Sequence, residues 1–245
     1  MKLSVIIVNW NTVDLTVQAI RSVFDQTSNF AYEVVVIDNH SSDNSVEKIK
    51  KIFPQVIILE NKENFGFGRA NNQGMKIAKG EYLFLLNSDT VVLDGAINKL
   101  VQYLDTNRDV MMVGPRLLNA DKTFQHACRR NLPTPMSAFY HLFGFVKFFK
   151  KNKVVNFYKK YSDDPECTEP VQAISGAAMM FRKEVYEKIG GFDEHFFMYG
   201  EDVDLSYRIQ KAGYKNYYFA GSSIIHFKGE STRKGSMNYV RMFYN

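Results

Sequence analysis

The chain has 245 residues, of which 45% are hydrophobic and 23% are charged, and its formal net charge at pH 7 is +5. A chain of this length and composition can bury one large core, which excludes a disordered protein and favours a single catalytic domain. Its two cysteines form no CxxC pair, which argues against a disulfide framework or a cysteine zinc site. The positive charge indicates only that a partner would be negatively charged. Nucleic acid, anionic lipid and phosphate-bearing small molecules all remain possible partners.

The apolar runs of the chain are interrupted well short of the roughly 20 residues that span a bilayer. The N-terminus passes directly into an apolar strand pattern, without a basic leader or a small-residue cleavage site. We therefore expect a cytoplasmic protein. Residues 136–161 differ from the rest, because they hold six lysines, nine aromatic residues and no acidic residue. That mixture suits peripheral contact with the inner face of an anionic membrane, and equally a packed segment whose lysines extend outward.

The first half of the chain alternates short β-branched runs with amphipathic stretches, which is the order of strands joined by helices in a parallel sheet. Four such units are predicted. The expected strands are residues 3–9, 32–38, 55–60 and 81–87, and the helices that follow them are residues 13–25, 44–52, 68–79 and 93–105. Near-continuous apolar character within the strands implies that helices cover both faces of the sheet.

The second half is less regular. A short strand ends at Gly114-Pro115, and residues 116–126 have the pattern of a hairpin that turns at residues 119–122. The elements expected after it are a strand near 177–182, helices at about 183–189 and 201–212, and a final strand near 222–226.

Polar residues follow each of the four predicted parallel strands, at residues 9–11, 38–40, 60–61 and 87–89. Ligands of open α/β sheets bind beyond the carboxyl ends of the strands, so we expect these residues to converge on one crevice. Several of them also suit helix N-caps, and only their recurrence at strand ends indicates a site.

Two motifs carry candidate metal ligands. Asp89 ends the triplet Asn87-Ser88-Asp89 after a buried strand, where a carboxylate can hold a divalent cation, although such triplets are most often turns. His226 ends an apolar strand, where a histidine is most often a hydrogen-bonded structural residue but can also complete a metal site.

A third motif carries candidate bases. Glu201, Asp202 and Asp204 fall in the first turn of a predicted helix, where the helix dipole favours carboxylates. The aromatic run at residues 196–199 would place this helix start in a partly dry environment, in which clustered carboxylates have raised pKa values and act as bases.

In this order, the motifs resemble the large family 2 of inverting glycosyltransferases, in particular its rhamnosyltransferase-like branch. The matching stretches are residues 5–11, 36–43, 64–74, 87–89, 190–194, 201–204 and His226. The resemblance implies an α/β protein with the GT-A fold: a single Rossmann-like, mostly parallel central sheet flanked by helices, with a smaller acceptor-side C-terminal part. It also implies one domain over residues 1–245, in which residues 1–115 bind the nucleotide sugar and residues 116–245 bind the acceptor and supply the catalytic base.

The resemblance assigns the nucleoside side of the donor to Asp38. The other residues that it places on the donor side are Asn9, Asn11, Asn64, Asn71 and Asn87. Arg208, or the pair Arg129-Arg130, is a candidate to bind the pyrophosphate, although most arginines are simply solvated. The residues expected on the acceptor side are Gly176 and Asp193.

The resemblance makes Asp89 and His226 the protein ligands of Mg²⁺ or Mn²⁺, which would neutralise the charge on the departing nucleoside diphosphate. Asn87 stands where many relatives have Asp, so the cation has one carboxylate fewer. Asp202 would remove the proton from the acceptor hydroxyl in one inverting displacement, and Glu201 would share that role or hold the acceptor.

The expected function is therefore transfer of a sugar, with rhamnose as the first candidate, from a UDP- or dTDP-sugar to a saccharide or lipid-linked saccharide in bacterial cell-surface polysaccharide synthesis. One alternative is an NAD-dependent Rossmann oxidoreductase, but residues 66–71 lack the third glycine of a dinucleotide fingerprint and follow the third strand instead of the first. A glycoside hydrolase that uses Asp89 and Asp202, and a non-catalytic sugar-nucleotide-binding protein, are the others. No nucleic-acid-binding module is recognised, so we expect no nucleic acid partner.

Overall fold

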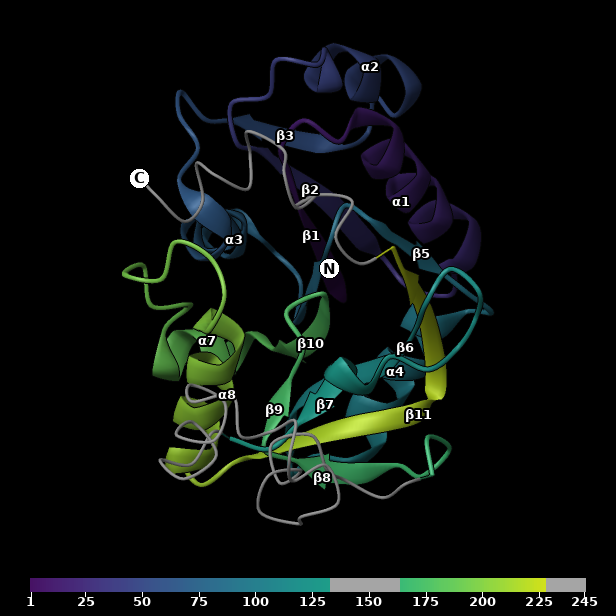
Figure 1. The fold of residues 1–245 in the computed structure, drawn as a ribbon, viewed down its shortest axis with the longest axis vertical. Helices are drawn as coiled ribbons and strands as arrows, with labels where there is room; N and C mark the ends of the chain where they lie inside the picture. Colours follow the sequence, from purple (N-terminus) through teal and green to yellow (C-terminus); the bar gives the residue numbers. More distant parts are fainter. Residues whose placement is uncertain (133–163, 228–245) are drawn as a thin grey trace, which may run out of the picture.

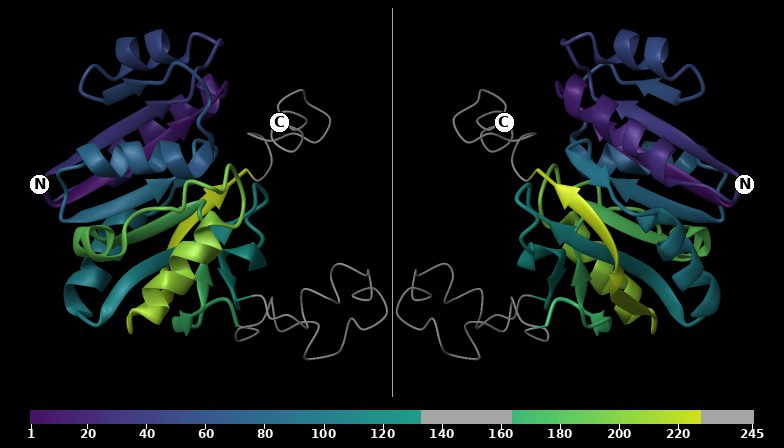
Figure 2. Two further views of the ribbon diagram at one scale, coloured as in Figure 1. Left: turned by 90° about the vertical axis from the view of Figure 1, so that its left-hand side faces the viewer. Right: turned by 90° about the vertical axis from the view of Figure 1, so that its right-hand side faces the viewer.

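The computed structural model describes residues 1–132 and 164–227. Their centre is a nine-stranded mixed sheet in the order β3-β2-β1-β4-β10-β6-β11-β5, and β8 pairs with β11 beside this path. Helices α3, α7 and α8 lie on one side of the sheet and α1 and α4 on the other (Figure 1). In the turned views, α3 and α8 lie in front of the sheet in the left panel, and α1 lies in front of it in the right panel (Figure 2). The expected single, helix-flanked and mostly parallel α/β sheet is therefore confirmed.

The first half has the predicted βα order. Its elements are β1 (Leu3–Asn9), α1 (Val13–Gln26), β2 (Tyr32–Asp38), α2 (Ser45–Ile52), β3 (Ile57–Glu60), α3 (Gly66–Ile77), β4 (Tyr82–Leu86), β5 (Thr90–Val92) and α4 (Ala96–Thr106). Strands β1 to β4 pair in parallel, and Asn9 lies opposite Asp38 at the carboxyl ends of β1 and β2. The short β5 was not predicted, because three residues are too few to show a hydrophobic period.

The second half adds strands of both directions to this sheet. Its elements are β6 (Val110–Leu118), the 3₁₀ turn η1 (His126–Cys128), β7 (Arg129–Arg130), β8 (Glu169–Val171), β9 (Ala173–Ile174), β10 (Ala178–Arg182), α7 (Lys183–Ile189), α8 (Glu201–Lys211) and β11 (Lys215–His226). β10 is antiparallel to both β4 and β6, and it joins the two halves in one sheet. Instead of a regular hairpin over residues 116–126, only Leu118 and Phe124 form an antiparallel bridge.

β11 is longer than the predicted strand at 222–226. It begins at Lys215 and pairs in turn with β8, β6 and β5. Its pairing with β6 shifts between Phe219 and Ser223, which lie opposite the adjacent residues Pro115 and Arg116. This interruption divides the strand into two short patterns, which explains why only its last part was predicted from the sequence.

Close packing of α3 on the sheet depends on Gly74. A Cβ at this position would lie 2.5 Å from a methyl group of the buried Ile6, so the absence of a side chain lets the helix approach β1. α3 therefore holds its N-terminus, which begins at Gly66, close to the carboxyl ends of β1 and β2.

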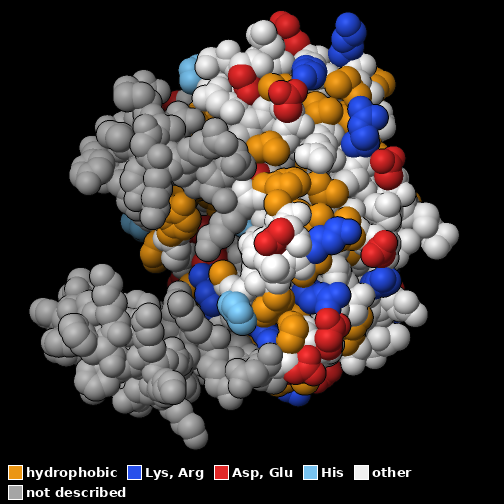
Figure 3. Space-filling view, turned by 45° about the vertical axis from the view of Figure 1, so that its right-hand side comes forward, with side chains coloured by type: hydrophobic (Ala, Val, Ile, Leu, Met, Phe, Trp, Pro, Cys, Tyr) orange, Lys and Arg blue, Asp and Glu red, His pale blue; other side chains and the backbone are white. Residues whose placement is uncertain are grey.

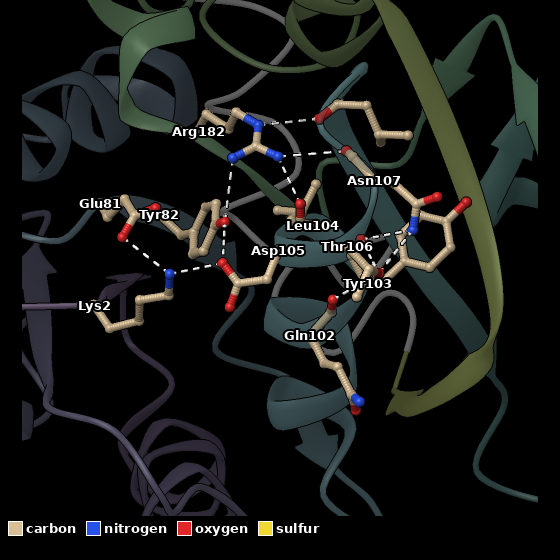
Figure 4. A network of polar contacts seen from close by, with 11 residues as sticks. Lys2, Glu81, Tyr82, Gln102, Tyr103, Leu104, Asp105, Thr106, Asn107 and Arg182 are labelled. Carbon is tan, nitrogen blue, oxygen red and sulfur yellow. Dashed lines mark hydrogen bonds and ion pairs between the residues drawn. The ribbon is translucent and has the colours of Figure 1, made fainter.

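A polar network lies at the edge of the sheet opposite the carboxyl ends of β1 and β2 (Figure 4). Asp105 of α4 accepts hydrogen bonds from Lys2 at 2.7 Å and from the Tyr82 hydroxyl at 2.7 Å, while the guanidinium of Arg182 donates to the same hydroxyl at 3.2 Å and to the Leu104 carbonyl at 2.6 Å. Burial, followed by the hydrogen bond to Asp105, raises the pKa of Tyr82 to about 12. The network ties α4 to β1, β4 and β10 at the edge away from the polar strand ends.

The surface mixes charges of both signs. On the face drawn in Figure 3, the basic and acidic side chains of the described residues are interspersed with apolar ones. Within residues 1–132 and 164–227, no helix combines the length and the apolar character that crossing a bilayer requires. Residues 136–161, for which membrane contact is one expectation, lie outside the described residues.

Candidate active site

Asp38 at the end of β2 is fixed by its neighbours. Its Oδ1 accepts a hydrogen bond from Asn9 Nδ2 at 2.7 Å, and its Oδ2 accepts one from the Ser41 backbone N–H at 2.9 Å. Asn9 is fully buried, and its Oδ1 accepts from the hydroxyls of Thr12 and Thr16. Asn9 therefore lies behind Asp38 and orients it, so the geometry favours a supporting role for this asparagine.

The loops that follow β1 and β2 bind each other. Asn11 has a left-handed backbone with a φ of 52°, and its Oδ1 accepts from the Ser42 backbone N–H at 2.8 Å. Asp43 accepts from the backbone N–H of Val13 at the start of α1 at 2.9 Å and from that of Ser45 at the start of α2 at 3.2 Å. A single carboxylate thus serves the N-termini of both helices, while the side chain of Thr12 makes no capping bond.

A hollow opens beside these loops. It is lined by Val8, Trp10, Asn39, Asn64, Gly66, Phe67, Asn87, Ser88, Phe197 and Met198. The predicted donor-side residues Asn64 and Asn87 are among them, and the buried Oδ1 of Asn87 has no hydrogen-bond partner among the described residues. An unsatisfied buried acceptor of this kind is suited to binding a ligand hydroxyl.

The loop at residues 190–200 closes one side of the hollow. The Phe67 backbone N–H donates to the Phe197 carbonyl at 3.0 Å, and a Cβ on Gly66 would overlap that carbonyl. Gly66 also has a φ of +78°, which L-residues rarely adopt. The glycine that made residues 66–71 similar to a dinucleotide fingerprint is therefore required here for contact between two protein segments.

Two predicted donor-side residues make contacts within the protein. Asn71 is buried, and its Nδ2 donates to the Phe67 carbonyl inside α3 at 2.9 Å. Arg208 pairs with Asp204 at 2.7 Å and donates to the Gly191 carbonyl at 2.7 Å. Neither residue lines the hollow, and their assignment to the donor remains a prediction.

Asp193, predicted on the acceptor side, lies in the loop at residues 190–200. It accepts hydrogen bonds from the His195 backbone N–H at 3.0 Å and from the His195 ring at 2.7 Å. These bonds hold the pKa of Asp193 below its usual range. The contacts are local to the loop, so its predicted role in acceptor binding is not decided by them.

Asp89 and His226 lie next to each other, although 137 positions separate them in the chain. β5 places His226 opposite Thr90, and the Phe227 backbone N–H donates to the Asp89 carbonyl at 2.9 Å. His226 Nε2 lies 3.4 Å from Asp89 Oδ1, and Asp89 is 1% exposed. The two side chains that were predicted as ligands of one cation therefore converge.

The residues fit a divalent cation. Neighbouring ligands of an octahedral ion with bonds of about 2.1 Å are about 3 Å apart, which is close to the Asp89–His226 separation. Among the described residues, no group of three or more His, Cys, Asp or Glu side chains could hold a metal. The described residues thus offer this ion the two side chains Asp89 and His226, and oxygens of a bound diphosphate or of water could take further positions.

The predicted base Asp202 is the second residue of α8 and accepts from three donors. Its Oδ2 accepts from the Gly176 backbone N–H at 3.0 Å and pairs with Arg130, and its Oδ1 accepts from the Val203 backbone N–H at 2.8 Å. Gly176 was predicted to contact the acceptor, and here its N–H orients Asp202. Arg130 was considered for the pyrophosphate, and the strand pair β7–β9 brings it to the carboxylate instead.

Glu201, next to Asp202, has a more apolar environment with fewer hydrogen-bond donors. It is 5% exposed, and its Oε2 has no hydrogen-bond partner among the described residues. Burial and the neighbouring charge of Asp202 raise the pKa of Glu201 to about 7, against the opposing effect of Arg130. The two adjacent acids thus differ in their environments: Asp202 is surrounded by donors, while Glu201 is desolvated.

The comparison with known families agrees with the motifs. Residues 4–190 match the family described as glycosyl transferase family 2. This chain belongs to that family. Residues 157–235 of this glycosyltransferase also match a second family, which is described as "N-terminal domain of galactosyltransferase". The relationship inferred from the motifs is therefore confirmed.

Individual relatives cover most of the chain. An N-acetylglucosaminyl-diphospho-decaprenol L-rhamnosyltransferase of Mycobacterium tuberculosis is 26% identical over 218 residues, which are 84% of this glycosyltransferase and 70% of that protein. The O-antigen biosynthesis protein RfbC of Myxococcus xanthus is 28% identical over 95% of this chain, which spans only 18% of that protein.

A solved structure, GalNAc-T7 with UDP, GalNAc and Mn²⁺, superposes with a TM-score of 0.68 over 98% of this glycosyltransferase and 48% of that chain. Its sequence identity is 20%, so the likeness concerns the fold. It confirms the expected GT-A fold.

Proposed function

We propose that this glycosyltransferase moves a sugar from a nucleoside diphosphate donor to a hydroxyl of a saccharide acceptor, with inversion and with the help of Mg²⁺ or Mn²⁺. The observation that carries the proposal is the convergence of Asp89 and His226, 3.4 Å apart, at the carboxyl edge of the sheet. Family membership supports the reaction class, and this pair supports dependence on a metal.

The first half of the chain would bind the donor, and the second half would bind the acceptor. Residues 1–115 supply Asp38, Asn64 and Asn87 for the donor, and residues 116–245 supply Asp202 for the acceptor. Because β10 from the second half inserts between β4 and β6, both halves belong to one sheet and hold donor and acceptor in one fixed frame.

The cation site would be formed by Asp89 and His226. What Mg²⁺ or Mn²⁺ supplies when bound is neutralisation of the charge that develops on the departing diphosphate. Asp89 is in the turn between β4 and β5, where its carbonyl accepts the Phe227 backbone N–H, and His226 ends β11, so backbone hydrogen bonds hold both residues.

Asp202 would accept the proton of the attacking hydroxyl. Its Oδ2 accepts from the Gly176 backbone N–H and from Arg130, and its Oδ1 accepts from the Val203 backbone N–H, which fixes the carboxylate plane. A lone pair on Oδ1 is then left for an acceptor hydroxyl. Glu201 would be largely neutral below about pH 7, when its carboxyl can donate a hydrogen bond to the acceptor.

The donor and acceptor are proposed from the relatives. The Mycobacterium tuberculosis relative is an L-rhamnosyltransferase, so dTDP-rhamnose is the first donor to test and a UDP-sugar the second. The names of that protein and of the Myxococcus xanthus relative also point to synthesis of bacterial cell-surface polysaccharide, with a saccharide or lipid-linked saccharide as acceptor. Peripheral contact with the inner face of the membrane remains part of this proposal.

A thermal-shift panel of nucleotide sugars, with and without Mn²⁺, tests the donor site, because a ligand of the native state raises the unfolding temperature by mass action. We expect one donor class to stabilise the protein and Mn²⁺ to increase the shift. Asp89→Asn should reduce the part that depends on Mn²⁺. An equal shift by NAD would favour the oxidoreductase.

Nucleotide release tests the reaction. We expect the wild type to release nucleoside diphosphate only when an acceptor saccharide is present, and Asp202→Asn to bind donor without releasing it. Hydrolysis of oligosaccharides without any nucleotide would favour a glycoside hydrolase. Donor binding without turnover, with every acceptor class, would favour a non-catalytic sugar-nucleotide-binding protein.

A further inference from the structure

Gln125 lies behind the candidate metal pair. It precedes η1, is 6% exposed, and its backbone N–H donates to the Leu117 carbonyl of β6 at 2.9 Å. Neither the motifs nor the proposed mechanism involves this residue. Its side chain is directed at His226, which it contacts twice.

The orientation of the Gln125 amide is determined by its partners. Its Nε2 donates to the His226 backbone carbonyl at 2.7 Å and to the Leu118 carbonyl at 3.3 Å. A backbone carbonyl can only accept, so the group that faces both must be the NH₂. The other end of the amide, Oε1, therefore faces His226 Nδ1 at 3.1 Å.

This contact selects one tautomer of the histidine. An amide oxygen can only accept, so Nδ1 of His226 must carry the hydrogen. In the neutral ring Nε2 then has its lone pair free, and Nε2 is the atom that lies 3.4 Å from Asp89 Oδ1. Two acceptor atoms facing each other at this distance repel, unless a cation or a proton lies between them.

We propose that Gln125 is a positioning residue that holds His226 in the Nδ1–H tautomer and so offers Nε2 to a divalent cation shared with Asp89. The inference rests on the proposed function for its cation, while the selection of the tautomer rests on the Gln125 contacts alone. Partners of this kind typically change metal affinity by about 10- to 100-fold when they are removed.

The first experiment reads the tautomer in the metal-free protein. Two-dimensional ¹H–¹⁵N spectra of the imidazole nitrogens at pH 8 distinguish the tautomers, and a His226→Asn sample assigns the signal. We expect the Nδ1–H form in the wild type, a shift toward Nε2–H in Gln125→Leu, and recovery of Nδ1–H in Gln125→Glu, which keeps an oxygen acceptor. A wild-type ring in the Nε2–H form, or one protonated at both nitrogens, would overturn the proposal.

The second experiment measures Mn²⁺ affinity by electron paramagnetic resonance in the presence of UDP. Gln125→Leu should bind Mn²⁺ about 10- to 100-fold more weakly than the wild type. Gln210→Leu is the matched control, because Gln210 Nε2 also donates to two carbonyls, those of Val171 at 3.1 Å and Gln172 at 2.7 Å, without a histidine. Equal losses in both variants would mean that Gln125 acts only on stability, and would refute its positioning role.

The two experiments separate the two proposals. If the wild type shows the Nδ1–H tautomer but binds no Mn²⁺ with any nucleotide, the metal-dependent function fails, and with it the purpose assigned to Gln125. If the wild type binds Mn²⁺ and Gln125→Leu changes neither the tautomer nor the affinity, the function stands and the role of Gln125 is refuted.

Discussion

The buried Glu201 makes a prediction about stability that does not depend on any substrate. Its side chain is 5% exposed, and its pKa is raised from an ordinary value of 4.5 to about 7 by burial and by the charge of Asp202. Between these two values the native state keeps the proton while the unfolded chain loses it. Native stability from this group is therefore fully present below about pH 4.5 and is lost as pH rises through about 7.

The size of the effect follows from the difference in pKa. About 2.5 units at about 1.4 kcal/mol per unit correspond to about 3 kcal/mol, most of it lost between pH 5 and pH 8. Glu201→Gln removes the ionisation. The variant should therefore gain stability relative to the wild type as pH rises, and its unfolding free energy should depend less on pH.

Urea unfolding of both proteins from pH 5 to pH 8 measures this difference. With a slope of about 3 kcal/mol per molar urea, the midpoint of the variant should move up by about 1 M relative to the wild type over this range. Glu187→Gln, at an exposed position of α7, is the control and should follow the wild type at each pH. Parallel curves for Glu201→Gln and the wild type would refute the desolvation of Glu201.

Three further predictions concern activity and the loop contact. Asp202→Asn should keep donor binding, measured by thermal shift, but lower kcat by at least roughly a hundredfold, which is the lower end of what a general base supplies. Turnover at the wild-type rate would show that Asp202 is not the base. Arg130→Met should lower kcat more than it changes KM for the donor, because Asp202 loses the guanidinium that orients its carboxylate, and Arg130→Lys should restore part of kcat. A change in stability without a change in kcat would contradict this. Gly66→Ala should destabilise the protein by about 1–3 kcal/mol in urea unfolding, because the added Cβ meets the Phe197 carbonyl in a left-handed backbone, and an unchanged midpoint would refute the tight contact.

The strands with uniform apolar character were predicted best. β1 and β2 have the predicted bounds, because near-continuous apolar runs end abruptly in polar residues at Asn9 and Asp38. β11 was predicted only in its last part, since the shift in pairing between Phe219 and Ser223 interrupts its period. The antiparallel direction of β10 could not be predicted from the sequence pattern either, because its place between β4 and β6 depends on long-range pairing.

The site divides in the same way. Asp89, in the turn after β4, and His226, at the end of β11, could be placed because residues at the ends of strands in one sheet meet at its edge. The contacts of Gln125 and Arg130 could not be predicted, because both residues lie in an irregular stretch without a hydrophobic period. Their partners follow from the pairing of β7 with β9 and from the path of the chain after β6, which are tertiary features.

Because of the interruption in β11, we expect activity to depend on the number of residues in this strand. Residues 220–222 of β11 have no counterpart on β6, where Pro115 and Arg116 are adjacent. His226 lies three residues after Ser223. Side chains of a strand alternate between its faces, so removing or adding one residue here would turn the imidazole away from Asp89. Engineering of this region should accordingly tolerate exchanges of side chains far better than insertions or deletions.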